Sequence, residues 1–175
     1  NLMNGKVWVK SEVNKGSEFH FVGWLGTIGA PKDKNPMLAS LSGKMALLVS
    51  KNKLSLHVCT QALKLLDMKV EVSKDAQKVY EILQQAATVD NPFHICIFDT
   101  EMTGSEGYEA IKQVRENKSQ FSDISLIALS SSMERDSAVC EAAGFDALLR
   151  NPPHREKLYK LLERVILDKT RKKET

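Results

Sequence analysis

The chain has 175 residues, of which 42% are hydrophobic and 27% are charged, so it is long enough and apolar enough to bury a core without disulfides or structural metals. Its 25 basic and 22 acidic residues leave a net charge of +3, which is too small to indicate nucleic-acid binding by itself. No apolar run approaches the roughly 20 residues that a membrane-spanning helix needs. Cys59, Cys96 and Cys140 lie far apart in apolar surroundings, which predicts reduced core thiols of a cytoplasmic protein.

Residues 1–28 are predicted to form a β-hairpin. Polar and apolar residues alternate over 6–10 and again over 18–22, and residues 14–17 supply a turn. Because a lone hairpin is marginally stable in water, we expect it to pack on the rest of the chain or on another domain. The chain starts with Asn1 and shows no signal peptide, so we also expect a fragment of a longer protein.

Residues 29–42 contain two prolines, a glycine, two lysines and small polar residues, which predicts a linker. From 43 to 168, short apolar strands alternate with amphipathic helices five times. The predicted strands are 46–49, 68–72, 95–98, 126–129 and 147–149, and the predicted helices are 54–66, 76–86, 108–114, 133–143 and 156–167. This pattern predicts an α/β flavodoxin-like fold with a doubly wound, five-stranded parallel sheet. Residues 169–175 are expected to be a basic tail or linker.

Polar residues follow four of the predicted strands. They are Ser50 with Lys51, Asp99, Ser130 and Asn151. Ligands of doubly wound folds bind at the carboxyl ends of the strands, so these side chains are the candidates for a functional site. A second interpretation of Asp99 is that it only caps the turn that follows it.

Three segments resemble the receiver domains of two-component signalling, and the resemblance covers about residues 44–168. IFDTEMTGSEG at 97–107 resembles the loop around the phospho-accepting aspartate, which falls on Asp99. LIALSS at 126–131 resembles the strand that ends in the switch hydroxyl, which falls on Ser130. GFDALLRNP at 144–152 resembles the segment that ends in a Lys-Pro pair.

The predicted hairpin carries a second resemblance. GKVWVKSE at 5–12 and GSEFHF at 16–21 are similar to the C-terminal hairpin of the ATP-binding domain of histidine kinases. The resemblance implies a parent hybrid histidine kinase, a phosphotransferase that could itself be membrane-anchored. The nucleotide-binding boxes are absent, so the fragment itself is not expected to catalyse.

The chain differs from the receiver pattern at positions that would bind Mg2+ and the phosphoryl group. Receivers hold Mg2+ with an acidic pair after the first strand, and here Ser50 and Lys51 stand at those positions. A lysine pointing inward would compete with the metal, which leaves Asp99 as a weak ligand at best. Asn151 replaces the lysine that pairs with the phosphoryl group, and an amide carries no charge to do so. Leu148 replaces the usual switch aromatic.

Three hypotheses of function follow. The preferred one is a degenerate receiver (a pseudo-receiver), a regulatory module that binds the dimerisation or ATP-binding domain of its own kinase. The alternative is a receiver that accepts a phosphoryl group on Asp99 in a His-Asp phosphorelay and passes it to a further receiver or phosphotransfer domain. The third is an unrelated flavodoxin-like small-molecule binder. Mg2+ is the one cofactor considered; neither nucleic acid nor membrane is an expected partner.

Overall fold

The computed structural model describes residues 4–24, 36–89, 91–102 and 105–173. The chain divides into two compact units, Asn1–Lys34 and Asn35–Thr175. Within the described ranges, every helix is too short or too polar to cross a membrane.

The first unit is the predicted hairpin. Strands β1 (Lys6–Glu12) and β2 (Gly16–Val22) pair antiparallel, with Val7 opposite Phe21 and Val9 opposite Phe19. Because opposed residues share a face, these four side chains form one apolar surface. Each of them is more than half exposed. Within its own unit, therefore, this apolar face of the hairpin is uncovered.

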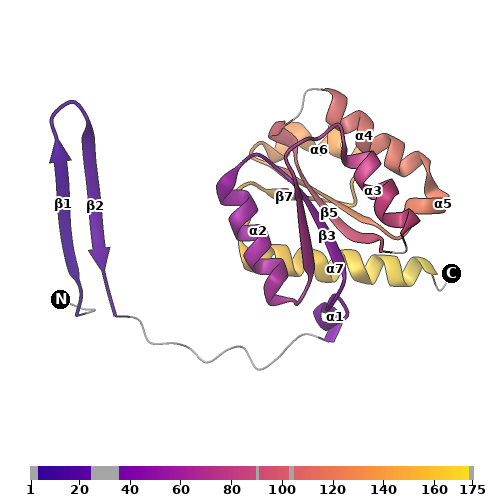
Figure 1. Ribbon diagram of the computed structural model, residues 1–175, viewed down its shortest axis with the longest axis horizontal. Helices are drawn as coiled ribbons and strands as arrows, with labels where there is room; N and C mark the ends of the chain where they lie inside the picture. The colour runs from indigo at the N-terminus through magenta and orange to yellow at the C-terminus, as the bar shows by residue number, and fades with distance from the viewer. Residues whose placement is uncertain (1–3, 25–35, 90, 103–104, 174–175) are drawn as a thin grey trace. The chain divides into compact units, whose positions relative to one another are not determined.

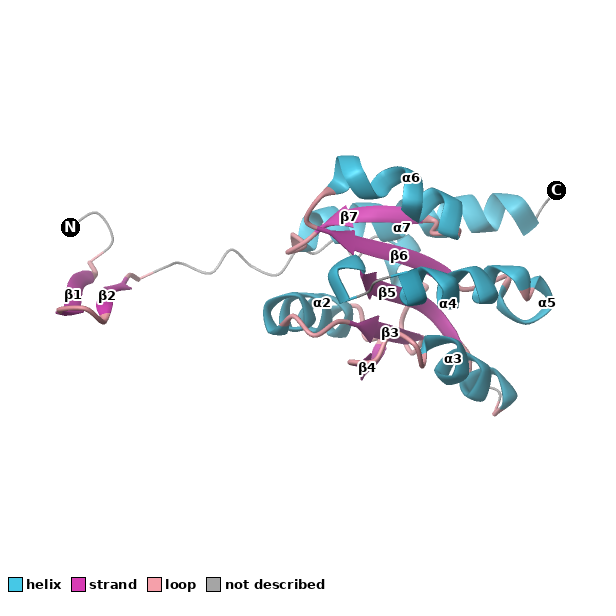
Figure 2. Ribbon diagram, turned by 90° about the horizontal axis from the view of Figure 1, so that it is seen from above, coloured by secondary structure: helices cyan, strands magenta, loops and turns pink. Residues whose placement is uncertain are grey.

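The second unit contains one parallel sheet in the order β4-β3-β5-β6-β7 (Figures 1 and 2). The strands are β3 (Met45–Val49), β4 (Lys69–Ser73), β5 (Phe93–Asp99), β6 (Ser125–Ser130) and β7 (Ala147–Arg150). Counted within the unit, the strand order is 2-1-3-4-5, with each strand followed by a helix. The predicted flavodoxin-like fold is confirmed.

Helices cover both faces of the sheet (Figure 2). They are α1 (Pro36–Ala39), α2 (Lys53–Leu65), α3 (Val79–Thr88), the 3-10 turn η1 (Thr100–Met102), α4 (Ser105–Glu116), α5 (Lys118–Phe121), α6 (Met133–Ala143) and α7 (Arg155–Lys173). One core cluster packs α2 and α7 against the sheet, and the other packs α3, α4 and α5 against the opposite face. Alternate residues of each buried strand contribute to the two clusters, as the pleat requires.

Several element boundaries differ from the sequence prediction. Helix α1 lies inside the predicted linker 29–42, and Leu38 and Leu41 near it belong to the core of the second unit. Residues 29–35 of that linker lie outside the described residues. At the other end, α7 continues to Lys173, so residues 169–173 of the predicted tail are helical. Helix α3 begins at Val79 rather than 76, because hydrogen bonds between Ser73 and Asp75 form a turn first.

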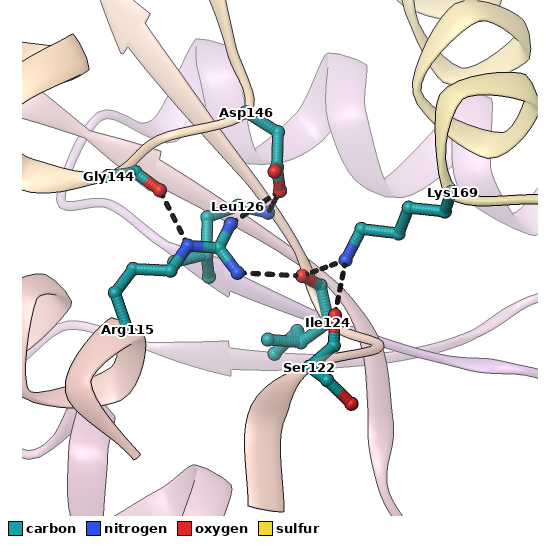
Figure 3. A network of polar contacts seen from close by, with 7 residues as sticks. All are labelled: Arg115, Ser122, Ile124, Leu126, Gly144, Asp146 and Lys169. Atoms are coloured by element: carbon teal, nitrogen blue, oxygen red, sulfur yellow. Dashed lines mark hydrogen bonds and ion pairs between the residues drawn. The ribbon is translucent and has the colours of Figure 1, made fainter. Parts of the chain in front are cut away.

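A charged network links the elements at the amino ends of the strands (Figure 3). Arg115 of α4 donates to the carbonyl of Gly144 at 2.6 Å and to that of Ile124 at 3.2 Å, and it pairs with Asp146 at 2.5 Å. Asp146 also accepts from the backbone N–H of Leu126 at 2.8 Å, where β6 begins. This arginine therefore joins α4 to the loops that precede β6 and β7.

Gly144 is required where it stands in this network. It ends α6 with a φ of +92°, in the left-handed region. A Cβ built on it would lie 2.5 Å from Cγ of Arg115, so any larger residue would displace the arginine. From α7, Lys169 reaches the same region and donates to the carbonyls of Ser122 and Ile124 (Figure 3).

Candidate functional site

Four of the predicted site residues gather at the carboxyl edge of the sheet. Asp99 is the last residue of β5, Ser130 is the last of β6, Ser50 follows β3 and Asn151 follows β7. Parallel strands all end at the same edge, and β3, β5, β6 and β7 are successive neighbours. The four residues are between 0% and 8% exposed. They are buried polar groups, so each needs a hydrogen-bond partner.

Ser50 and Asp99 are hydrogen-bonded to each other. The Ser50 hydroxyl donates to Oδ2 of Asp99 at 2.7 Å, and the Ser50 oxygen accepts from the backbone N–H of Asn52 at 3.0 Å. Oδ1 of Asp99 accepts from the backbone N–H of Glu101 at 3.1 Å. Asp99 thus caps the turn that follows it, as the second interpretation of the sequence proposed, and it also accepts a hydrogen bond from the neighbouring strand end.

The Asp99 carboxylate lies on the α2 face of the sheet. Ile95 and Ile97, which alternate with Asp99 along β5, both belong to the core cluster that α2 and α7 cover. Burial raises the pKa of the Cys59 thiol on α2 to about 12, and the charge of Asp99 is the second cause. The Cys59 thiol is therefore protonated and uncharged at neutral pH, and it is not a nucleophile.

Asn151 has its own partner. The hydroxyl of Ser55, in the first turn of α2, donates to Oδ1 of Asn151 at 2.5 Å. The backbone N–H of Asn151 donates to the carbonyl of Ser130 at 2.8 Å, and the Asn151–Pro152 peptide bond is cis. At this position the site has a buried, hydrogen-bonded amide that carries no charge.

The other positions at which the sequence departs from receivers lie away from this buried cluster. Lys51 is exposed, so the expected competition of an inward lysine with a metal is not observed. Arg150 is exposed, as strand alternation predicts, and Leu148 is half-buried. The cationic side chains next to the cluster thus lie at its surface.

Ser130 makes contacts on the opposite face of the sheet. Its hydroxyl donates to Oδ2 of Asp136, in the first turn of α6, at 2.6 Å. The Thr100 hydroxyl lies 3.0 Å from the carbonyl of Leu129 and 3.3 Å from the same Asp136 oxygen. Sequence reasoning missed Asp136; an acidic residue in the first turn after Ser130 was the available indication.

The residues at this edge do not fit a magnesium ion. Mg2+ needs octahedral oxygen coordination, with one or two carboxylates supplying the protein's charge. Among the described residues Asp99 is the one buried carboxylate, and each of its oxygens already accepts a hydrogen bond. Across the described ranges, His, Cys, Asp and Glu side chains form no group of three or more that could hold a metal.

Comparison with known proteins identifies the family. Residues 46–163 match the family model of the response regulator receiver domain. The chain is 27% identical over 145 residues to "Probable histidine kinase 6" of Oryza sativa subsp. japonica, covering 73% of the chain but only 14% of that protein's length.

Two solved structures show the same fold. The receiver domain of the sensor histidine kinase PA1611 from Pseudomonas aeruginosa PAO1, with a magnesium ion in its active-site cleft, is 23% identical at a TM-score of 0.60; the match covers 71% of this chain and 98% of that one. The Saccharomyces cerevisiae complex of the phosphotransfer protein Ypd1 with the Ssk1 receiver domain is 19% identical at 0.57, covering 70% and 88%. The chain belongs to the response regulator receiver family and is related to the receiver domains of histidine kinases.

Proposed function

We propose that this receiver domain is a degenerate one that regulates a hybrid histidine kinase by binding its other domains, without efficient phosphorylation of Asp99. The observation that carries the proposal is the hydrogen bond between Ser50 and Asp99. A neutral hydroxyl occupies a position at which receivers carry acid, and it bonds directly to the oxygen that a phosphoryl group or a metal would need.

The charges that phosphoryl transfer requires support the same proposal. Such a site works by positioning the reactants and by stabilising the charge on the transferred group. Ser50 adds no negative charge with which to hold a cation, Lys51 is exposed, and Asn151 is neutral and bonded to Ser55. Two of the three parts that would manage charge are therefore replaced, while the acceptor Asp99 remains.

A regulatory role does not need those parts. A receiver tethered to its kinase meets the other domains at an effective concentration in the millimolar range, so weak docking is enough to occupy a surface. The domains that we propose as partners are the dimerisation and ATP-binding domains of the same polypeptide. Switching would require a ligand or partner that binds two conformations with different affinities.

The uncovered face of the hairpin supports the proposed origin of residues 1–28. Val7, Val9, Phe19 and Phe21 lie on one side of a two-stranded sheet, and the described residues of this unit, 4–24, add no third strand or helix to it. Such a surface is typical of an edge element removed from a larger core. We propose that it belongs to the C-terminal end of a histidine-kinase ATP-binding domain.

The second candidate is a phospho-accepting receiver in a phosphorelay. It is favoured by the place of Asp99 at the end of the central strand and of Ser130 at the end of the next one. A phosphotransfer protein such as the one bound to the Ssk1 receiver would then be the partner.

Incubation with acetyl phosphate and Mg2+, followed by intact mass spectrometry, separates the two candidates. We expect no phosphorylated species from the chain. A triple variant with Ser50→Asp, Lys51→Asp and Asn151→Lys, hereafter the restored variant, is expected to gain one phosphoryl group that Asp99→Asn removes. Stoichiometric phosphorylation of the unmodified chain, lost in Asp99→Asn, would contradict the first candidate and establish the second.

A further inference from the structure

The edge of the sheet carries a second carboxylate whose position neither the family pattern nor the proposed function explains. Asp136 lies on α6, and its side chain is 14% exposed. Its Oδ2 accepts from Ser130 at 2.6 Å and lies 3.3 Å from the Thr100 hydroxyl, while Oδ1 accepts from Arg135 at 3.1 Å. Asp136 therefore contacts hydroxyls at the carboxyl ends of two neighbouring strands.

The hydrogen-bond capacity of Ser130 makes this contact consequential. A serine hydroxyl has a single proton to donate, and that of Ser130 goes to a carboxylate, which forms a shorter and stronger bond than a neutral acceptor does. The Ser130 oxygen also accepts from the backbone N–H of Ser132 at 2.9 Å. The side chain is thus fixed at both its donor and its acceptor.

The alternation of residues along the strands shows on which face of the sheet the Ser130 side chain is held. Asp99 alternates with residues of the core cluster on the α2 face, whereas Ser130 alternates with Leu126 of the cluster on the other face. Asp136 holds the Ser130 hydroxyl on the α6 side. To donate to an oxyanion attached to Asp99, Ser130 would first have to break its bond to Asp136.

We propose that Asp136 is a positioning residue that holds the Ser130 hydroxyl on the α6 side of the sheet and so withholds it from an oxyanion at Asp99. The proposal rests on the assignment of Asp99 as the acceptor position. It adds a second reason for inactivity, one that does not depend on the missing acidic pair. The hydrogen bond from Ser130 is also the largest of the causes that lower the pKa of Asp136, so the carboxylate is ionised at neutral pH.

The first test needs no ligand. The χ1 rotamer of Ser130 is measured from Hα–Hβ couplings in the unmodified chain, Asp136→Ala, Asp136→Asn and Glu134→Gln. Glu134 lies in the same first turn of α6 and is exposed, so its substitution removes one charge without touching Ser130. We expect one rotamer in the unmodified chain, in Glu134→Gln and in Asp136→Asn, whose amide oxygen still accepts. Rotamer averaging is expected in Asp136→Ala.

The second test measures the consequence at Asp99. Beryllofluoride with Mg2+, which mimics a phosphoryl group on aspartate, is titrated into the restored variant with and without Asp136→Ala. Releasing one charge-assisted hydrogen bond is expected to raise the affinity about tenfold. Glu134→Gln in the same background is expected to change it by less than about twofold, since an exposed charge is screened.

Two results would overturn the proposal. One is a single, unchanged Ser130 rotamer in Asp136→Ala. The other is an affinity gain no larger in Asp136→Ala than in Glu134→Gln, which would mean that only charge is involved. The helical carbon shifts of α6 show whether the alanine variant remains folded; if it does not, Asp136→Asn must give a smaller gain in the same direction. Because the rotamer test uses no metal or phosphoryl mimic, its failure would leave the proposed function of the acceptor site standing.

Discussion

The charged residues at the two edges of the sheet have different kinds of partner. At the amino edge, Arg115 is paired with Asp146 and also donates to two carbonyls. At the carboxyl edge, buried Asp99 is bonded to a serine and a backbone N–H, and Lys51, which follows that serine in the sequence, is exposed. The carboxylate at the amino edge is paired with a cation, whereas Asp99 at the carboxyl edge accepts from neutral donors. This contrast is what the proposed degenerate receiver predicts, because the fold is kept and the partners of the acceptor position differ.

The largest expected effect is at the amino edge. Arg115→Ala leaves Asp146 and two carbonyls without this partner, so we expect a loss of about 2–4 kcal/mol in the free energy of unfolding. Urea unfolding followed by helical circular dichroism measures it, since both tryptophans, Trp8 and Trp24, lie in the hairpin unit.

The control for that measurement lies on the same helix. Lys112→Ala removes an exposed pair with Glu109, and it should cost less than about 0.5 kcal/mol. Equal losses in the two variants would mean that the network of Arg115 does not stabilise the fold as described.

A smaller effect is expected at the carboxyl edge. Ser50→Ala removes the donor to Asp99 and the acceptor of the Asn52 N–H, which should cost about 1–2 kcal/mol. Ser50→Asp with Lys51→Asp should instead destabilise the chain in chelator and recover stability as Mg2+ is added. Urea unfolding with and without Mg2+ checks both. If Mg2+ also stabilised the unmodified chain, its carboxyl edge would bind the metal, and the proposed difference between the two edges would be wrong.

The free energy of unfolding should depend on pH through one group near each edge of the sheet, and the two groups should act in different pH ranges. Burial, then the charge of Lys44, lowers the pKa of His94 near the amino edge. The unfolded chain therefore takes up this proton first, and stability should fall by less than about 1 kcal/mol as pH drops below about 6.5. The hydrogen bond from Ser130 lowers the pKa of Asp136 at the carboxyl edge. The stability that ionised Asp136 contributes is therefore kept at lower pH, and it is lost as the pH falls through the pKa that Asp136 has in the folded chain.

Unfolding curves from neutral to acid pH test this order. His94→Gln should flatten the first decline and leave the second, while Asp136→Asn should do the reverse. A first decline that survives in His94→Gln would assign it to another group.

The smallest expected effect is on thiol reactivity. Burial raises the pKa of Cys59 and of Cys96 to about 12, and it also raises that of Cys140. We expect an aromatic disulfide reagent at neutral pH to modify all three at least about a hundredfold more slowly in the folded than in the unfolded chain. Rapid modification of Cys59 alone would show that α2 opens next to Asp99.

The sequence predicted the fold well because its patterns are local. Buried strands such as 95–98 are continuous apolar runs, and helix 133–143 has a glycine at its end. Helix α1 was missed because it has only four residues, begins at a proline inside the predicted linker, and is held by packing of Leu38 and Leu41 on the core. No local pattern records such tertiary contacts.

The site was predicted in position but not in its bonding. The strand ends located Asp99, Ser130 and Asn151 at one edge, since parallel strands end together. The partners of these residues depend on how helices from elsewhere in the chain are oriented, so Ser55 and Asp136 were not anticipated. The replacement of Ser50 was seen as a lost charge, and its hydrogen bond to Asp99 became visible only in three dimensions.

The most direct test of the central claim is an amide NMR titration of the unmodified chain with Mg2+ and then with beryllofluoride, run beside Asp99→Asn. We expect no saturable shifts around Asp99, Ser130 and Asn151 at millimolar metal. Saturable shifts that vanish in Asp99→Asn would contradict it, because they would show a working acceptor site with an unusual metal shell.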